Sequence, residues 1–72
     1  MDRLQYSVMM SLVTIYHNDV LINTYKNVEV CEFNYCICIK GHNNNWNYAY
    51  TNIRRWYYDV KELSLTIELI NY

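Results

Sequence analysis

The chain has 72 residues, of which 53% are hydrophobic and 18% charged, and its formal net charge is −1. A chain of this length supplies one small domain, residues 1–72, which buries only about 60% of the surface that its unfolded form exposes. A deep catalytic pocket is therefore not expected. The absence of a basic surplus argues against nucleic acids and anionic membranes as partners, because both attract positively charged proteins.

The cysteine pattern and the apolar runs indicate an intracellular protein. Cys31, Cys36 and Cys38 are odd in number and closely spaced, which is not typical of a disulfide framework. No apolar run reaches the length of about 20 residues that spans a bilayer, and no secretory signal is visible. We expect a reducing compartment such as the cytosol.

Two runs of alternating apolar and polar residues flank the polar pair Asn18-Asp19. The alternation predicts strands over residues 5–16 and 20–25. Asn and Asp tolerate positive φ, so the pair predicts a two-residue hairpin turn. Lys26-Asn27 predicts a second turn, followed by a third strand over residues 28–40.

These two turns define a register for the three strands. The register places Ile15 opposite Ile22, Tyr16 opposite Leu21, Ile22 opposite Cys31 and Val20 opposite Phe33. Because side chains alternate between the two faces of a strand, it also predicts one shared buried face. The members of that face are Val13, Ile15, Val20, Ile22 and Phe33.

The C-terminal half begins with a polar loop over residues 41–45 and an alternating aromatic run at Trp46, Tyr48 and Tyr50. The period then changes, and residues 51–61 predict a helix. The apolar side of that helix consists of Ile53, Trp56, Tyr57 and Val60. Alternation over residues 63–69 predicts a last strand. The expected fold class is α+β, a small antiparallel β-meander sheet with one helix packed on its aromatic face. The alternative is an all-β fold in which residues 51–61 are also strand.

Catalytic and metal-binding constellations are sparse. The two histidines, His17 and His42, both fall in predicted turns, so no nucleophile has an evident base. We expect no enzyme and no cofactor. Cys36 and Cys38 with His42 offer three zinc ligands where a structural site needs four, and Cys31 is expected on the other side of its strand. A zinc-stabilised module is therefore an alternative, not the main prediction.

Aromatic and basic residues mix over residues 46–58, where Arg54 and Arg55 follow Trp46, Tyr48 and Tyr50. Such a mixture is able to stack bases and bind phosphates. However, a chain this short needs its aromatic residues for a core. A small nucleic-acid-binding domain is a second alternative.

The predicted hairpin lacks the usual protection of a sheet edge. Between residues 11 and 25 only His17 and Asp19 are able to carry charge, and both lie at the turn. Proteins normally protect sheet edges with charges or proline. The outer face of the hairpin is expected to be apolar or aromatic at Leu12, Tyr16, Leu21 and Tyr25. This edge predicts pairing with the sheet of another protein. The alternatives are a homodimer through the same edge and cover of the edge by the N-terminal residues.

The segment Ser11–Asn23, and especially Tyr16-His17-Asn18-Asp19, resembles the hairpin of small orthopoxvirus interferon antagonists. It is also similar to a short segment of henipavirus V proteins. The resemblance implies a viral inhibitor of host interferon signalling that acts in the host cytoplasm. Its hairpin would extend the sheet of the Src-homology-2 domain of a STAT transcription factor and block docking to the phosphorylated receptor. A phage-encoded inhibitor of another protein remains an alternative.

The periodicity and the resemblance together predict one partner-binding site on the hairpin. Its residues are Leu12, Thr14, Tyr16, His17, Asn18, Asp19, Val20, Leu21, Asn23 and Tyr25.

Overall fold

The computed structural model describes residues 4–70, which form one sheet of six strands and one short 3-10 helix. In chain order the elements are β1 (Leu4–His17), β2 (Val20–Phe33), β3 (Cys36–Lys40), β4 (Asn45–Ala49), η1 (Tyr50–Asn52), β5 (Ile53–Asp59) and β6 (Ser64–Leu69). The strands lie in the order β4-β3-β2-β1-β6-β5. β1 and β6 are parallel, and the other neighbours are antiparallel. Over the described range, no helix has both the length and the apolar character needed to cross a membrane.

The predicted hairpin forms, and it is longer than predicted. β1 and β2 pair from Leu4 opposite Phe33 to His17 opposite Val20. Tyr16 lies opposite Leu21 as predicted. Ile15, however, lies opposite Asn23, because a bulge gives β2 one extra residue at this point.

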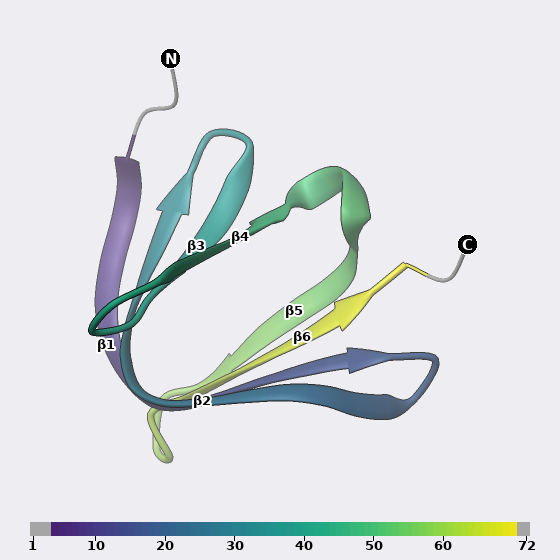
Figure 1. Cartoon of the computed structure of the whole chain (residues 1–72), viewed down its shortest axis with the longest axis horizontal. Coiled ribbons are helices and arrows are strands. Elements are labelled where there is room, and N and C mark those ends of the chain that lie inside the picture. Colours follow the sequence, from purple (N-terminus) through teal and green to yellow (C-terminus); the bar gives the residue numbers. More distant parts are fainter. Residues whose placement is uncertain (1–3, 71–72) are drawn as a thin grey trace.

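Both hairpin strands change the face that they bury near their middle. In β1 the buried side chains pass from Met10 to Val13, and in β2 from Tyr25 to Val28. A spacing of three in place of two means that each strand is irregular there, and irregularities of this kind bend strands. The hairpin therefore turns a corner halfway along its length, as Figure 1 shows.

Specific backbone features hold this corner. Asn27 adopts a φ of 54°, a left-handed conformation that asparagine tolerates better than most residues. On β1, the N–H groups of Ser11 and Leu12 both donate to the carbonyl of Leu63, at 2.7 and 3.4 Å. The predicted turn at Lys26-Asn27 is thus wrong, because the positive φ bends β2 without reversing it.

Because the chain does not reverse at this bend, the third strand begins later in the sequence than predicted. The chain reverses after Phe33, so β2 ends there and β3 begins at Cys36. Glu32 is paired with Ile37 and Cys31 with Cys38. The predicted pairs of Ile22 with Cys31 and of Val20 with Phe33 do not form.

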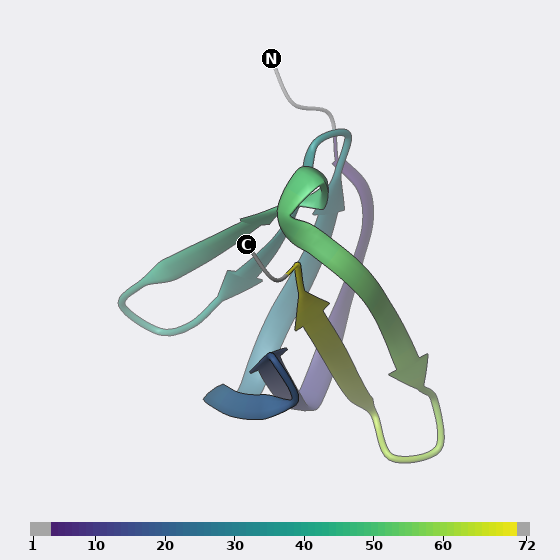
Figure 2. The same cartoon turned by 90° about the vertical axis from the view of Figure 1, so that its right-hand side faces the viewer.

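The corner divides the sheet into two arms that enclose the core (Figures 1 and 2). β3 and β4 extend the first arm, and β5 and β6 extend the second. Aliphatic side chains from both arms, with Tyr25, meet on the concave side. The buried members are Met10, Val13, Ile15, Tyr25, Val28, Val30, Ile37, Ile39, Ile53, Leu65 and Ile67.

The predicted helix over residues 51–61 is absent, and this corrects the α+β fold class to an all-β arrangement. Only η1 is helical in the described residues, and β5 follows it directly. A register shift in β5 between Ile53 and Arg55 adds one residue. Ile53 and Trp56 therefore share the concave side at a spacing of three, which imitates helical periodicity. The last predicted strand is confirmed as β6.

Candidate partner-binding edge

The hairpin turn is formed by Asn18 and Asp19, whose φ angles are 55° and 62°. Two consecutive positive φ angles are the signature of a type I′ turn, which matches the natural twist of a hairpin. Both residues are exposed. The tip of the hairpin therefore projects from the second arm with a defined backbone.

Beyond the corner, another strand pairs with one margin of the hairpin but not with the other. The β1 margin is covered, because Leu12–His17 pair with Ser64–Leu69 of β6. The β2 margin pairs with β3 only from Glu29 to Glu32. Between Val20 and Val28, no other strand of residues 4–70 lies against β2 on the side away from β1. We call this stretch of β2, Val20–Val28, the open edge.

The start of the open edge is apolar and accessible. Val20, Leu21 and Ile22 are 59%, 48% and 47% exposed. The first charged side chain of β2 is Lys26. By contrast, the outermost strand of the second arm, β5, carries Arg54, Arg55 and Asp59, all exposed. Charged side chains on an edge strand discourage pairing with foreign strands, so the open edge is the less protected of the two.

The structure places the ten predicted partner-binding residues in different settings. Asn18, Asp19, Val20, Leu21 and Asn23 are exposed at the turn or the open edge. Leu12, Thr14, Tyr16 and His17 are half-buried and lie on the covered strand β1. Tyr25 is buried in the core, so its prediction as an outer-face residue is wrong. The cause is the bulge at Ile22, which reverses the alternation of faces along β2.

Three of the five residues predicted for the buried face are not buried. Val13 and Ile15 are fully buried as expected. Val20 and Ile22 are instead exposed, and Phe33 is half-buried. Sequence periodicity therefore assigns Val20 and Ile22 to the core, although they belong to the most accessible part of the open edge.

A polar hollow of about 200 Å³ lies beside the turn on the β6 side of the hairpin. Arg55 and Glu68 form an ion pair at 2.8 Å next to it. The hydrogen bond to Glu68 raises the pKa of the Arg55 guanidinium. The hollow brings Tyr16 and Asp19 of the hairpin together with residues of β5 and β6. Its lining is Tyr16, Asn18, Asp19, Arg54, Glu68 and Leu69.

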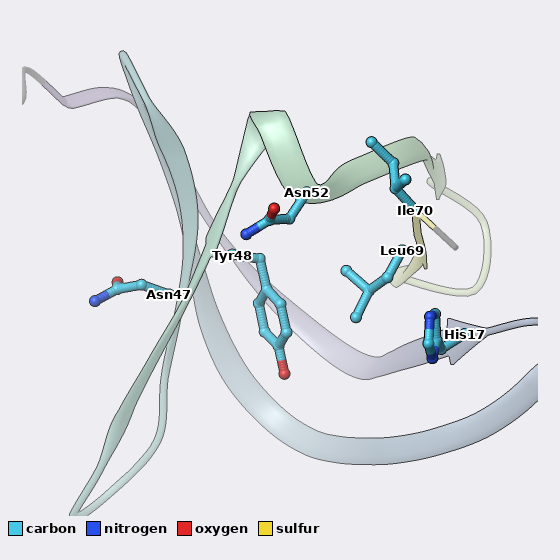
Figure 3. A pocket seen from close by; sticks show the side chains of 6 residues that line it. All are labelled: His17, Asn47, Tyr48, Asn52, Leu69 and Ile70. Carbon is cyan, nitrogen blue, oxygen red and sulfur yellow. The ribbon is translucent and has the colours of Figure 1, made fainter. Parts of the chain in front are cut away.

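A mainly apolar hollow of about 210 Å³ lies on the concave side, between the end of β1 and β4 (Figure 3). In Figure 3 the Tyr48 ring and Leu69 point into it, whereas the Asn47 side chain points away. The hydroxyl groups of Tyr48 and Tyr25 are 2.7 Å apart. Burial raises the pKa of Tyr48, and the hydrogen bond with Tyr25 raises it further. The lining is His17, Asn47, Tyr48, Asn52, Leu69 and Ile70.

The alternative sites look different in the structure. Trp46, Tyr48 and Tyr50 pack against the core. Trp56 stacks on Tyr50, with ring centroids 5.1 Å apart. These contacts occupy much of the aromatic surface that would be needed to stack bases.

The cysteines do not assemble a metal site in the described part of the chain. Cys31 lies directly opposite Cys38 on β3, which corrects the expectation that it points away. Both thiols are buried, and burial raises the pKa of Cys38. No group of three His, Cys, Asp or Glu side chains among residues 4–70 is arranged to hold a metal ion.

No protein-family model, curated protein or solved structure matches the chain. The resemblance at Tyr16–Asp19 consequently stays a prediction, and any proposed function depends on the geometry of the open edge.

Proposed function

We propose that the protein is a non-enzymatic inhibitor that binds another protein by adding the open edge of β2 to that protein's sheet. The single observation that carries this proposal is the run of backbone from Val20 to Val28 with a strand on one side only. Main-chain hydrogen bonds supply affinity in such complexes, and alternate side chains supply specificity.

The exposed aliphatic residues at the start of the edge support the same proposal. Val20, Leu21 and Ile22 are adjacent in sequence, so their side chains are available to both faces of an added sheet. Burial of a large aliphatic side chain contributes about 1.5–3 kcal/mol. Contact with a partner would therefore bury apolar surface that each of these residues exposes to water in the free protein.

The partner that we propose is the Src-homology-2 domain of a STAT transcription factor, in the cytoplasm of a virus-infected host cell. The resemblance at Tyr16-His17-Asn18-Asp19 supports this choice, and these residues lie at the hairpin tip next to the open edge. Occupation of that domain would prevent its docking to a phosphorylated receptor and so block interferon signalling.

The binding site differs from the one expected from sequence. β6 covers β1, so the backbone contacts fall on β2, whereas Leu12 and Thr14 contact the protein's own sheet. Thr14 lies 3.4 Å from Thr66, measured between the hydroxyl oxygens. We therefore assign the contact to Val20, Leu21, Ile22 and Asn23, flanked by the turn.

The test is calorimetric titration of the purified protein with isolated STAT Src-homology-2 domains. Ile22→Lys should weaken binding at least about tenfold, equivalent to about 1.4 kcal/mol, because a charge replaces an apolar contact. Val60→Lys is the matched control, since Val60 is 81% exposed in the loop between β5 and β6. It should bind within about twofold of wild type.

Two results would contradict the proposal at different levels. If no STAT domain binds, the choice of partner is wrong. If binding occurs and Ile22→Lys leaves it unchanged, the open edge is not the contact surface.

A further inference from the structure

The first arm carries three thiols on its convex side. The aliphatic neighbours of these cysteines in β2 and β3 point into the core. Adjacent residues of a strand point to opposite faces of the sheet, so the cysteines share the other face. They are Cys31, Cys36 and Cys38. The proposed function uses none of them.

The strand register favours one disulfide out of the three that these cysteines allow. Cys31 lies directly opposite Cys38, a position in which Cα atoms are about 4.5–5.5 Å apart. A disulfide joins Cα atoms that are about 4.4–6.8 Å apart. Cys36 and Cys38 are separated by two positions of one strand, about 6.8 Å, with their Cβ atoms pointing the same way. Cys36 is diagonal to Cys31, at about 7–8 Å.

The two opposite thiols differ in their surroundings. Cys31 and Cys38 are 2% and 4% exposed, and the Cys31 thiol lies 3.7 Å from the Ser7 hydroxyl, to which it donates. Cys38 also lines an open hollow of about 490 Å³, together with Lys40. Burial raises the pKa of the Cys38 thiol and Cys31 raises it further, whereas Lys40 lowers it. A small reagent therefore reaches the pair from the Cys38 side.

We propose that Cys31 and Cys38 are a redox-sensitive pair that closes to a cross-strand disulfide when oxidised glutathione enters the hollow. The Cys38 thiolate attacks one sulfur of oxidised glutathione, forms a mixed disulfide and releases one glutathione thiolate. The Cys31 thiolate then attacks the Cys38 sulfur, forms the protein disulfide and releases the second glutathione thiolate. The protons of the two cysteines pass to these leaving groups, and the two electrons reduce the glutathione disulfide.

The disulfide would tie β2 to β3 close to the end of the open edge. A reducing compartment keeps such a pair as thiols, so the bond would form only when the share of oxidised glutathione rises. The cross-link would stabilise the fold, because it restrains the unfolded chain. This inference goes beyond the proposed function, since it concerns the first arm and does not depend on a partner.

The experiment is oxidation of the folded whole chain by a large excess of oxidised glutathione, followed by alkylation of the remaining thiols and peptide mass spectrometry. The wild type should lose the mass of two hydrogen atoms, and the disulfide should link Cys31 with Cys38. Cys36→Ala is the matched control and should form the same disulfide to the same extent. Cys31→Ala should lose the internal disulfide and stop at mixed disulfides with glutathione.

Oxidation of the wild type in concentrated urea separates the effect of the fold from that of the sequence, because an unfolded chain permits all three pairings. In the folded protein, the disulfide of Cys31 with Cys38 should exceed the other two at least about tenfold. Circular dichroism must show that each variant is folded. If Cys31→Ala fails to fold, Cys31→Ser replaces it, since serine is closer to cysteine in size.

Three results would overturn the proposal. The first is a folded wild-type protein whose thiols all stay reduced in excess oxidised glutathione. The second is a main disulfide that contains Cys36 or joins two chains. The third is an oxidised protein that unfolds at a lower urea concentration than the reduced protein, which would show that the native strands do not fit the bond. None of them bears on STAT binding, which is measured separately.

Discussion

Hydroxyl groups of tyrosine join the two arms of the sheet at individual residues. Tyr58 of β5 donates a hydrogen bond to Glu32 of β2, and Tyr25 and Tyr48 share another. Burial and the hydrogen bond with Glu32 raise the pKa of Tyr58. The pKa of Tyr48 is raised in the same way by burial and by Tyr25. The rings of Tyr48 and Tyr58 therefore pack against the core while their hydroxyl groups stay protonated.

The raised pKa values predict loss of stability at alkaline pH. A pKa above the unfolded value of 10.0 means that the unfolded chain releases its proton first as pH rises, which favours unfolding. The free energy of unfolding should begin to fall near pH 9, because the unfolded chain then loses the thiol proton of Cys38, whose folded pKa burial also raises. It should fall more steeply above pH 10, where the tyrosines of the unfolded chain ionise. Urea titration at each pH measures it.

The matched control is the double variant Tyr48→Phe with Tyr58→Phe. It should be less stable at pH 7, because Glu32 loses a donor, yet its stability should fall less steeply above pH 10. A slope identical to that of wild type would show that other groups cause the alkaline loss.

Bends and bulges decide how each strand is used at the scale of elements. The bend at Asn27 folds the hairpin over the core, and the bulge at Ile22 turns Tyr25 into the core. Both irregularities insert a single position into an otherwise alternating pattern. A pattern that is regular on either side of such a position gives no sign in the sequence of where the shift occurs.

Several of the errors made from sequence have this origin. Alternation predicted β6, which keeps a period of two, and the existence of the two hairpin strands, whereas the tolerance of Asn and Asp for positive φ predicted the turn. The predicted helix over residues 51–61 arose from the register shift in β5, where Ile53 and Trp56 are three apart on one face. The prediction of a turn at Lys26-Asn27 correctly identified a position suited to positive φ. The sequence does not show whether such a position bends the chain or reverses it.

Asn27 provides a test of the bend. Asn27→Val should lower the free energy of unfolding by about 1–2 kcal/mol, because a β-branched residue is strained at a φ of 54°. Asn27→Gly should change it by less than about 1 kcal/mol. Thr24→Val is the control, since Thr24 is an exposed residue of the same strand. If the two valine variants were equally stable, the positive φ would not matter for the fold.

At the scale of the whole molecule, residues 4–70 form a single sheet whose margins are unequally protected. β6 covers the β1 side of the hairpin from Leu12 to His17, and β3 covers the β2 side only from Glu29 to Glu32. The sequence indicated an unprotected hairpin because charges are scarce between residues 11 and 25. It did not indicate which margin stays open, since the pairing of β1 with β6 joins segments that are far apart in the chain and carries no local signal.

The central claim is that one side of β2 from Val20 to Lys26 is paired and the other is open, and amide hydrogen exchange measured by NMR tests it most directly. Amides of this segment that point away from β1 should exchange near the rate of an unfolded chain, and those paired with β1 at least about a hundredfold more slowly. Slow exchange of both sets would show that the edge is covered, and fast exchange of both would show that the hairpin is not formed; either result would contradict the account.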